Sequence, residues 1–292
     1  METSSLSHSR RKTTSIRKLV FLLSRKFSPL RIYEFSGRSW NGKQESCKDL
    51  SHCLLLITEQ VSRIDYQVQD FVNRRYKNGT VTVICHDRQA IGIAIAANSR
   101  FFITVLTQGK LLYSNEQMLG YEPIKPYDPS KARQRAQELF NYRMPIARSF
   151  FAAATECQKL GHYTISTFLL HQCTEQALIC MIRVHLGYRS EFHNIHRLLG
   201  LCLAFSPRPY HTLLDIEDDG RLFNQLAKSY SSARYHSGFS ISEADSFAIS
   251  DRVYKLLSLT EEMYFDQVSL LERIAQGYIA GKVMDINYHT AI

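Results

Sequence analysis

The spacing of apolar side chains changes several times in the first third of the chain. Residues 16–27 carry apolar side chains at helical intervals, which predicts a helix. Residues 30–35 alternate apolar and polar side chains as a strand does, and residues 53–57 form an unbroken apolar run typical of a strand buried on both faces. The elements expected next are a helix at 64–76, a strand at 80–85, a helix at 101–106 and a strand at 111–113. Residues 14–118 are therefore predicted to form a small mixed α/β domain.

The pattern becomes helical after a proline-rich segment. Three prolines, at positions 123, 126 and 129, mark residues 119–129 as a linker. Residues 130–292 are periodic like helices almost throughout, which predicts an all-α bundle. The expected helices cover 130–142, 145–160, 163–186, 194–204, 216–235 and 242–277, with breaks at Gly161, Gly187, Gly238 and at the segment from Ser206 to Pro209. The fold class predicted is α+β, with the mixed domain first and the bundle second.

The composition is that of a globular protein with a basic N-terminal segment. Hydrophobic residues make up 45% of the chain and charged residues 22%. The net charge is +9, and residues 1–50 hold +7 of it, from eleven Lys or Arg and four Asp or Glu. Residues 1–13 are almost free of apolar side chains, which predicts a disordered basic tail. Such a segment suits binding of nucleic acid or another polyanion, and it equally suits a solvated tail.

Cysteine usage and hydropathy indicate the compartment. The chain has seven cysteines, an odd number, and no Cys-x-x-Cys pair, which predicts reduced thiols rather than a disulfide or zinc framework. No apolar run is long enough to span a bilayer, and residues 19–23 are too few for the core of a signal peptide. We expect a cytoplasmic protein that does not act at a membrane.

The most specific motif lies in the helical half. Residues 170–178 read LHQCTEQAL, which on a helix places His171 and Glu175 one turn apart on a shared face. Three further patterns follow, namely Gly187-Tyr188, a helix start at 193–199 that reads HNIHRLL, and SARY at 232–235. These four patterns, in this order, resemble the HEPN family over about residues 130–275.

The HEPN resemblance implies a helical bundle, often dimeric, with a polar groove for nucleotide or RNA. Carried over by position, the groove residues are His171, Gln172, Glu175, His196, Arg234 and Tyr235. Arginine can hold phosphate, His and Glu can move protons, and Tyr can stack on a base. The alternative is that His171 and Glu175 form a structural polar pair at a helix contact or dimer contact.

Many HEPN proteins are metal-independent ribonucleases with an Arg-x(4–6)-His motif on a late helix. Arg189 and His196 have that spacing, but they lie before the third helix of the bundle. At the expected place Arg234 is followed by His236, with one residue between them. The nuclease motif is thus absent or displaced, and Arg189 and His196 are weak catalytic candidates.

The segment between residues 32 and 57 is similar to the start of a polymerase-β-like nucleotidyltransferase, a domain commonly fused ahead of HEPN bundles. The turn Ser36-Gly37-Arg38 stands where that family has its Gly-Ser turn. The family then places an Asp-x-Asp pair, which holds two magnesium ions, at the start of the next strand. The corresponding positions are Ser51 and Cys53, or Asp49 and Ser51 if the pair is shifted.

At most one carboxylate of that pair survives, which cannot hold two hard cations. Asp87 could replace the third carboxylate of the family, although an aspartate at a strand end is more often a turn former. We therefore predict a degenerate, inactive nucleotidyltransferase-like domain in which Gly37 and Arg38 could still hold a phosphate.

These observations favour a non-catalytic protein that binds nucleotide or RNA. Two alternatives stay open. One is an enzyme, either a ribonuclease through Arg189 and His196 or a nucleotidyltransferase through Asp49. The other is a dimeric regulatory or protein-interaction module. We expect a homodimer formed through the bundle and no cofactor, with Mg²⁺ required only if the nucleotidyltransferase-like domain is active.

Overall fold

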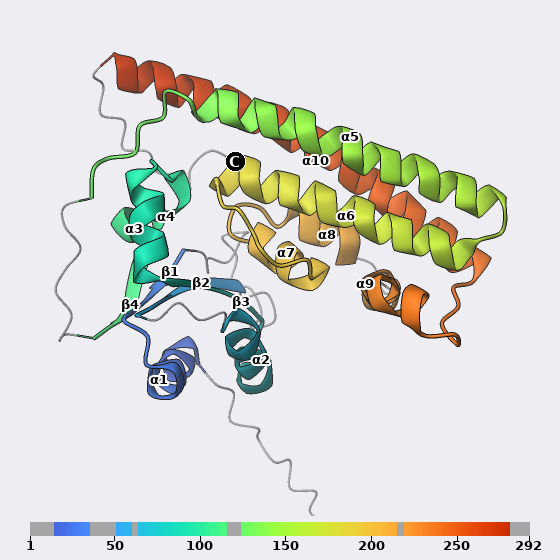
Figure 1. The fold of residues 1–292 in the computed structure, drawn as a ribbon, viewed down its shortest axis with the longest axis horizontal. Helices are drawn as coiled ribbons and strands as arrows, with labels where there is room; N and C mark the ends of the chain where they lie inside the picture. The colour runs from blue at the N-terminus through green and yellow to red at the C-terminus, as the bar shows by residue number, and fades with distance from the viewer. Residues whose placement is uncertain (1–14, 36–50, 60–63, 116–123, 215–218, 281–292) are drawn as a thin grey trace, which may run out of the picture.

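The computed structural model describes residues 15–35, 51–59, 64–115, 124–214 and 219–280. Figure 1 shows a small sheet with short helices beneath it and a layer of longer helices above it. The predicted fold class is confirmed, because a mixed sheet region is followed by an all-helical region.

The sheet has four strands in the order β3-β2-β1-β4. The strands are β1 (Arg31–Glu34), β2 (Ser51–Thr58), β3 (Thr80–Asp87) and β4 (Lys110–Ser114). Strands β2 and β3 are parallel, and β1 runs antiparallel to both β2 and β4. Strand β2 is buried at every position, as its continuous apolar run predicts, because it is a central strand covered on both faces.

The two faces of the sheet contribute to two different cores. Below the sheet, α1 (Ile16–Phe27) and α2 (Asp65–Arg75) pack on side chains that include Leu54 and Leu56. Above it, Cys53, Leu55 and Ile57 belong to a core that continues into the long helices. The sheet and the helical layer are therefore joined by one continuous apolar core. The predicted boundaries at 14–118, 119–129 and 130–292 stay predictions.

The sheet and the helical layer approach each other closely at α7 (Ile195–Cys202). A β-carbon added to Gly200 would lie 2.2 Å from the hydroxyl oxygen of Thr82 on β3, so a side chain there cannot be accommodated without a shift. Glycine at this position lets the backbone of α7 rest directly on the sheet.

Two short helices follow β3 at one end of the sheet. They are α3 (Arg88–Ala96) and α4 (Arg100–Gln108), and both elements take part in the upper core. Within the residues described, no single helix has the length and hydropathy of a membrane span. The bent pair α3 and α4, with 112° between them, passes that test jointly by length and composition.

The helical layer is built around α6. Its members are α5 (Ala132–Lys159), α6 (Tyr163–Leu186), α7, α8 (Arg208–Leu214), α9 (Asp219–Tyr235) and α10 (Glu243–Ile279). Helices α5 and α10 lie side by side on the outside, and α7 lies between α6 and the sheet (Figure 1). Helix α6 contacts α5, α7, α9 and α10, which explains why it is apolar almost all round.

Two expectations about this layer are wrong. The break between 142 and 145 does not exist, because α5 continues through Pro145. Proline cannot donate a hydrogen bond to the carbonyl of Asn141, but Met144 and Ala147 are buried beside it, and tertiary packing maintains the helix. The break expected at 206–209 is present only at Ser206 and Pro207, because α8, which was not expected, begins at Arg208. Pro209 falls in the first turn, where its missing N–H costs nothing.

Candidate functional site

Several of the predicted groove residues meet where α6, α7 and α9 come together. His171 of α6 lies against the ring of Tyr230 on α9, with 5.1 Å between ring centroids. The guanidinium of Arg234 lies close to two rings at this end of α9, at 4.3 Å from the Tyr230 ring and 5.1 Å from the Tyr235 ring. Its Nε donates to the Tyr230 carbonyl oxygen at 2.7 Å, which fixes the head group in place. We call Tyr230, Arg234 and Tyr235 the Arg234 platform.

The Arg234 platform faces solvent. Tyr235 is 74% exposed and Tyr230 38% exposed, and Arg234 is exposed as well. A planar cation among aromatic rings can contact phosphate and stack on a base at the same time. Sequence reasoning missed Tyr230, although its position four residues before Arg234 on one helix predicts that the two share a face.

His171 is buried beneath the Arg234 platform. Burial lowers its pKa to about 4, and the positive charges of Arg234 and His196 act in the same direction. The ring is therefore neutral at pH 7. Gln172 donates its amide to His171 Nδ1 at 3.2 Å, so these two groove residues are linked by a hydrogen bond.

His196 adjoins the same site from α7. Its ring meets the Phe223 ring edge-on at 4.7 Å, and burial lowers its pKa. It also lines a cleft of about 590 Å³ between α7 and the α2–β3 segment. Other lining residues of that cleft are Tyr66, Asn73, Asn194, Arg197 and Tyr210.

The carboxylate of Glu175 pairs with His193 and not with His171. His193 Nδ1 donates to its Oε1 at 2.9 Å, and no hydrogen bond joins the described side chains of Glu175 and His171. The side chain of Glu175 is 6% exposed and that of His193 67% exposed. The two motif residues share a helix, as predicted, but each has its own polar neighbour. No local pattern pointed to His193 as the partner, because eighteen residues separate it from Glu175.

Arg189 and His196 have different surroundings. His196 faces α9 through Phe223, whereas the charge of Arg189 acts on Arg183 at the end of α6. No hydrogen bond or ion pair joins Arg189 to His196, both of which are described. A catalytic role for this pair stays a prediction.

The positions expected for the magnesium ligands are packed into the fold where they are described. Ser51 and Cys53 are both buried on β2, and Cys53 Sγ donates to the Gly200 carbonyl oxygen of α7 at 3.5 Å. Asp87 caps α3 by accepting from the Ala90 backbone N–H at 2.8 Å, which is the turn-forming role. Gly37, Arg38 and Asp49 lie outside the described residues.

The donor set of these described positions does not fit a magnesium ion. A hydroxyl and a thiol inside the core are poor ligands for a hard cation. In the part of the chain that the structure describes, no group of three or more His, Cys, Asp or Glu side chains could hold a metal ion.

A buried hydrogen-bonded pair of His and Glu lies near these positions instead. His52 Nδ1 on β2 and Glu34 Oε1 on β1 are 2.5 Å apart, with side chains 8% and 11% exposed. Lys110 Nζ is 3.9 Å from the other carboxylate oxygen of Glu34. Sequence reasoning missed this pair because cross-strand neighbours are set by sheet register, which a single strand does not reveal.

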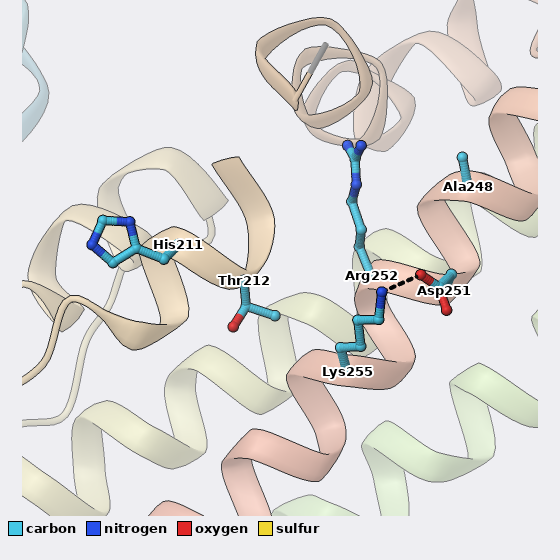
Figure 2. Close-up of a pocket in the computed structure, with 6 residues that line it drawn as sticks. All are labelled: His211, Thr212, Ala248, Asp251, Arg252 and Lys255. Atoms are coloured by element: carbon cyan, nitrogen blue, oxygen red, sulfur yellow. Dashed lines mark ion pairs between the residues drawn. The ribbon is translucent and has the colours of Figure 1, made fainter. Parts of the chain in front are cut away.

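A second hollow, of about 330 Å³, lies between α8 and α10 (Figure 2). Asp251 and Lys255 form an ion pair of 2.7 Å along its α10 wall, and His211 points away from them. Arg252 lines the same wall, which therefore carries two basic side chains and one carboxylate.

Comparison with known proteins identifies the helical region. Residues 127–264 match the HEPN domain, which confirms the resemblance predicted from the four motifs. The solved structures include a similar protein, the nucleotidyltransferase-like protein from Exiguobacterium sibiricum 255-15. It is 10% identical, with 87% of this chain and 79% of that chain covered and a TM-score of 0.27. No curated protein matches the chain. Residues 127–264 of this chain are a HEPN domain.

Proposed function

We propose that this is a non-catalytic nucleotide- or RNA-binding protein of the nucleotidyltransferase–HEPN type, with its binding site at the Arg234 platform. The observation that carries the proposal is the exposure of Tyr235 beside Arg234 at the end of α9, above buried His171. An exposed tyrosine beside a fixed guanidinium is suited to stacking on a base while contacting its phosphate.

The protonation states around the platform support binding rather than catalysis. A general base works best with a pKa near the operating pH, and His171, with a pKa of about 4, is far from it. His196 also has a lowered pKa, and the carboxylate of Glu175 is occupied by His193. These side chains form a polar floor to the site.

The basic residues near the N-terminus extend this proposal. They would add sequence-independent phosphate contacts, whose strength falls as salt rises. The degenerate nucleotidyltransferase-like region would then serve packing and binding, in keeping with the burial of Ser51 and Cys53.

Binding of fluorescent ATP and of a short single-stranded RNA, each with and without Mg²⁺, tests the proposal. We expect saturable binding without Mg²⁺ that weakens about 10-fold in Arg234→Ala, a loss in the range measured for one charge-assisted contact. Arg148→Ala is the matched control, because Arg148 is exposed on α5 and paired with Glu261. Equal loss in both variants would contradict the assignment, as would RNA cleavage or Mg²⁺-dependent nucleotide transfer by the wild type.

A dimeric interaction module is the second candidate, and the outer helices favour it. Tyr142 of α5 is 61% exposed, and Tyr254 and Phe265 of α10 are 59% and 63% exposed. Aromatic side chains of this size are enriched in protein interfaces. Light scattering would test this role, and we expect a dimer that Tyr254→Ser with Phe265→Ser converts to a monomer. A wild-type monomer at micromolar concentration would exclude it.

A further inference from the structure

The cleft of about 590 Å³ lies where an edge of the sheet meets α7. Strand β3 is the edge strand on that side, and its first residues form one wall of the cleft. Helix α2 provides Tyr66 and Asn73, and α7 provides His196 and Arg197. The volume is within the range of sites that bind small molecules.

The backbone groups at this edge of the sheet are bonded to side chains. Gln69 of α2 donates to the Val81 carbonyl oxygen at 2.8 Å and accepts from the Val83 N–H at 2.9 Å. Arg197 Nη2 donates to the Val83 carbonyl oxygen at 2.7 Å. These bonds take the place of a further strand, so the edge of β3 is not the part of the cleft that a ligand would bind.

The guanidinium of Arg197 has two other nitrogens that are not satisfied. The side chain is 8% exposed, and its Nε and Nη1 are buried without a hydrogen-bond partner among the residues that the structure describes. Of the described residues that line the cleft, Arg197 alone has buried side-chain nitrogens in this state. Because a buried N–H without an acceptor has lost its hydration, acceptor atoms supplied by a ligand would be favourable here.

Two aromatic rings hold the Arg197 guanidinium between them. Its central carbon lies 4.0 Å from the centre of the Phe192 ring and 5.4 Å from the centre of the Tyr66 ring. Phe192 is buried behind the guanidinium, whereas Tyr66 lines the cleft and is 62% exposed. The Tyr66 ring can therefore turn outward with little loss of packing, which would give a ligand access to the guanidinium.

The charges around the cleft favour a neutral ligand over an anion. The carboxylate of Asp65 is 3.8 Å from Arg197 Nη2, and Asp70, which lines the cleft, forms an ion pair with Arg74. Burial lowers the pKa of His196, so its ring adds no positive charge at pH 7. Each arginine near the cleft thus has a carboxylate beside it, and what Arg197 lacks is hydrogen-bond acceptors rather than negative charge.

We propose that this cleft binds a nucleobase, at a site separate from the Arg234 platform. A base is planar, neutral and rich in acceptor atoms, so its ring can stack on Tyr66 while its acceptors receive hydrogen bonds from Arg197. The choice of a nucleobase among planar ligands rests on the proposed function, which supplies nucleotides. The site itself rests on the unsatisfied Arg197 nitrogens and on the exposed ring beside them.

Nucleosides test the proposal, because they carry a base and no phosphate. Binding of guanosine, adenosine, cytidine and uridine to the full chain is followed by calorimetry and by saturation-transfer NMR, with inorganic phosphate as a competitor. The variants are Tyr66→Ala and Arg197→Lys, of which the second keeps the charge beside Asp65 but removes Nε and Nη1. Tyr278→Ala is the matched control, since Tyr278 is an exposed tyrosine of α10. Binding of ATP and of nucleosides to Arg234→Ala is measured in parallel.

We expect at least one nucleoside to bind the wild type saturably, without being displaced by inorganic phosphate. Tyr66→Ala should weaken that binding at least about 5-fold, the lower limit for the loss of one stacked base, and should leave the melting temperature unchanged. Arg197→Lys should weaken it by at least about as much, because lysine cannot replace the donors on the edge of a guanidinium. Tyr278→Ala should bind as the wild type does. If Arg197→Lys does not fold, the comparison of Tyr66→Ala with Tyr278→Ala decides.

The proposal is overturned if no nucleoside binds the wild type at millimolar concentration, or if Tyr66→Ala and Tyr278→Ala bind equally well. Displacement of the nucleoside by inorganic phosphate would overturn it too, since the cleft would then be an anion site.

The Arg234→Ala variant separates this site from the platform. Loss of ATP binding in Arg234→Ala, with nucleoside binding that depends on Tyr66, would support both sites. If Arg234→Ala changes neither ligand while Tyr66→Ala weakens the nucleoside, the cleft is retained and the platform is rejected. Nucleoside binding that is lost in Arg234→Ala and unchanged in Tyr66→Ala would place the base at the platform and reject the cleft.

Discussion

The candidate-site residues of the helical region and those of the sheet region differ in their exposure to solvent. In the helical region, Tyr235 stands exposed beside Arg234 at the end of a helix, with polar groups arranged beneath them. In the sheet region, Ser51 and Cys53 are enclosed by packing, and Glu34 and His52 are paired with each other. The exposed side chains are accessible to a ligand, whereas the buried ones take part in packing and in hydrogen bonds within the fold. This difference favours binding by the helical region and a structural role for the sheet.

The largest effect is expected from a substitution in the core of the sheet region. Leu55 is fully buried in the core that joins β2 to the helical layer. The Leu55→Ala substitution should lower the free energy of unfolding by about 2–5 kcal/mol, because it leaves a cavity that neither layer can fill. Urea unfolding followed by circular dichroism measures the change. Leu111→Ala is the control, since Leu111 is 48% exposed on an edge strand and should cost far less. Equal costs would show that β2 does not join the two layers as described.

The second effect concerns His171, which is buried beneath the Arg234 platform. The pKa of His171 is lowered from 6.5 to about 4 in the folded protein, chiefly by burial. The unfolded chain therefore binds the proton more tightly. Stability associated with this group is fully present above pH 6.5 and is lost as the pH falls toward 4, by up to about 3 kcal/mol.

Unfolding measured at pH 7 and at pH 4.5 tests this assignment. The loss of stability between the two should be smaller in His171→Asn than in the wild type. His185 is the matched comparison, because its pKa is also lowered by burial, to about 3, at a position away from the platform. An identical loss in His171→Asn and wild type would show that His171 is not held neutral by burial.

The smallest effect is expected from a substitution of the exposed Tyr235 in the helical region. Tyr235→Ala should leave the melting temperature unchanged, because the ring is 74% exposed. It should weaken RNA binding by about 1–3 kcal/mol, the range for loss of one stacked base. Anisotropy titration measures this, with Tyr278→Ala as a control for an exposed tyrosine elsewhere, at 51% exposure on α10. A fall in melting temperature without a change in binding would make Tyr235 a structural residue.

Much of the secondary structure could be predicted because it depends on local spacing. The helix at 163–186 was predicted with the bounds it has, and Gly187 ends it in a left-handed conformation with φ of 70°. The errors arose where tertiary packing outweighs local preference. Pro145 lies inside a helix that its neighbours stabilise, and Pro209 lies in the first turn of a short helix rather than preventing one.

The candidate site was predictable only in part. The order of four motifs identified the HEPN region and placed His171, Arg234 and Tyr235 in it. The role of Tyr188, in contrast, required the structure. Its hydroxyl lies 2.9 Å from His86 Nε2 of β3, so the Gly-Tyr motif helps to join the helices to the sheet.

The sequence by itself determined the element types, the change from a mixed to a helical region and the HEPN identity of the second half, because each depends on spacing along a single segment. Only the tertiary structure decided which polar groups meet. The pairs Glu34–His52 and Glu175–His193 each join residues from different segments of the chain, whose approach is set by sheet register and helix packing. The neutral state of His171 likewise follows from burial, which the packing of the whole layer creates.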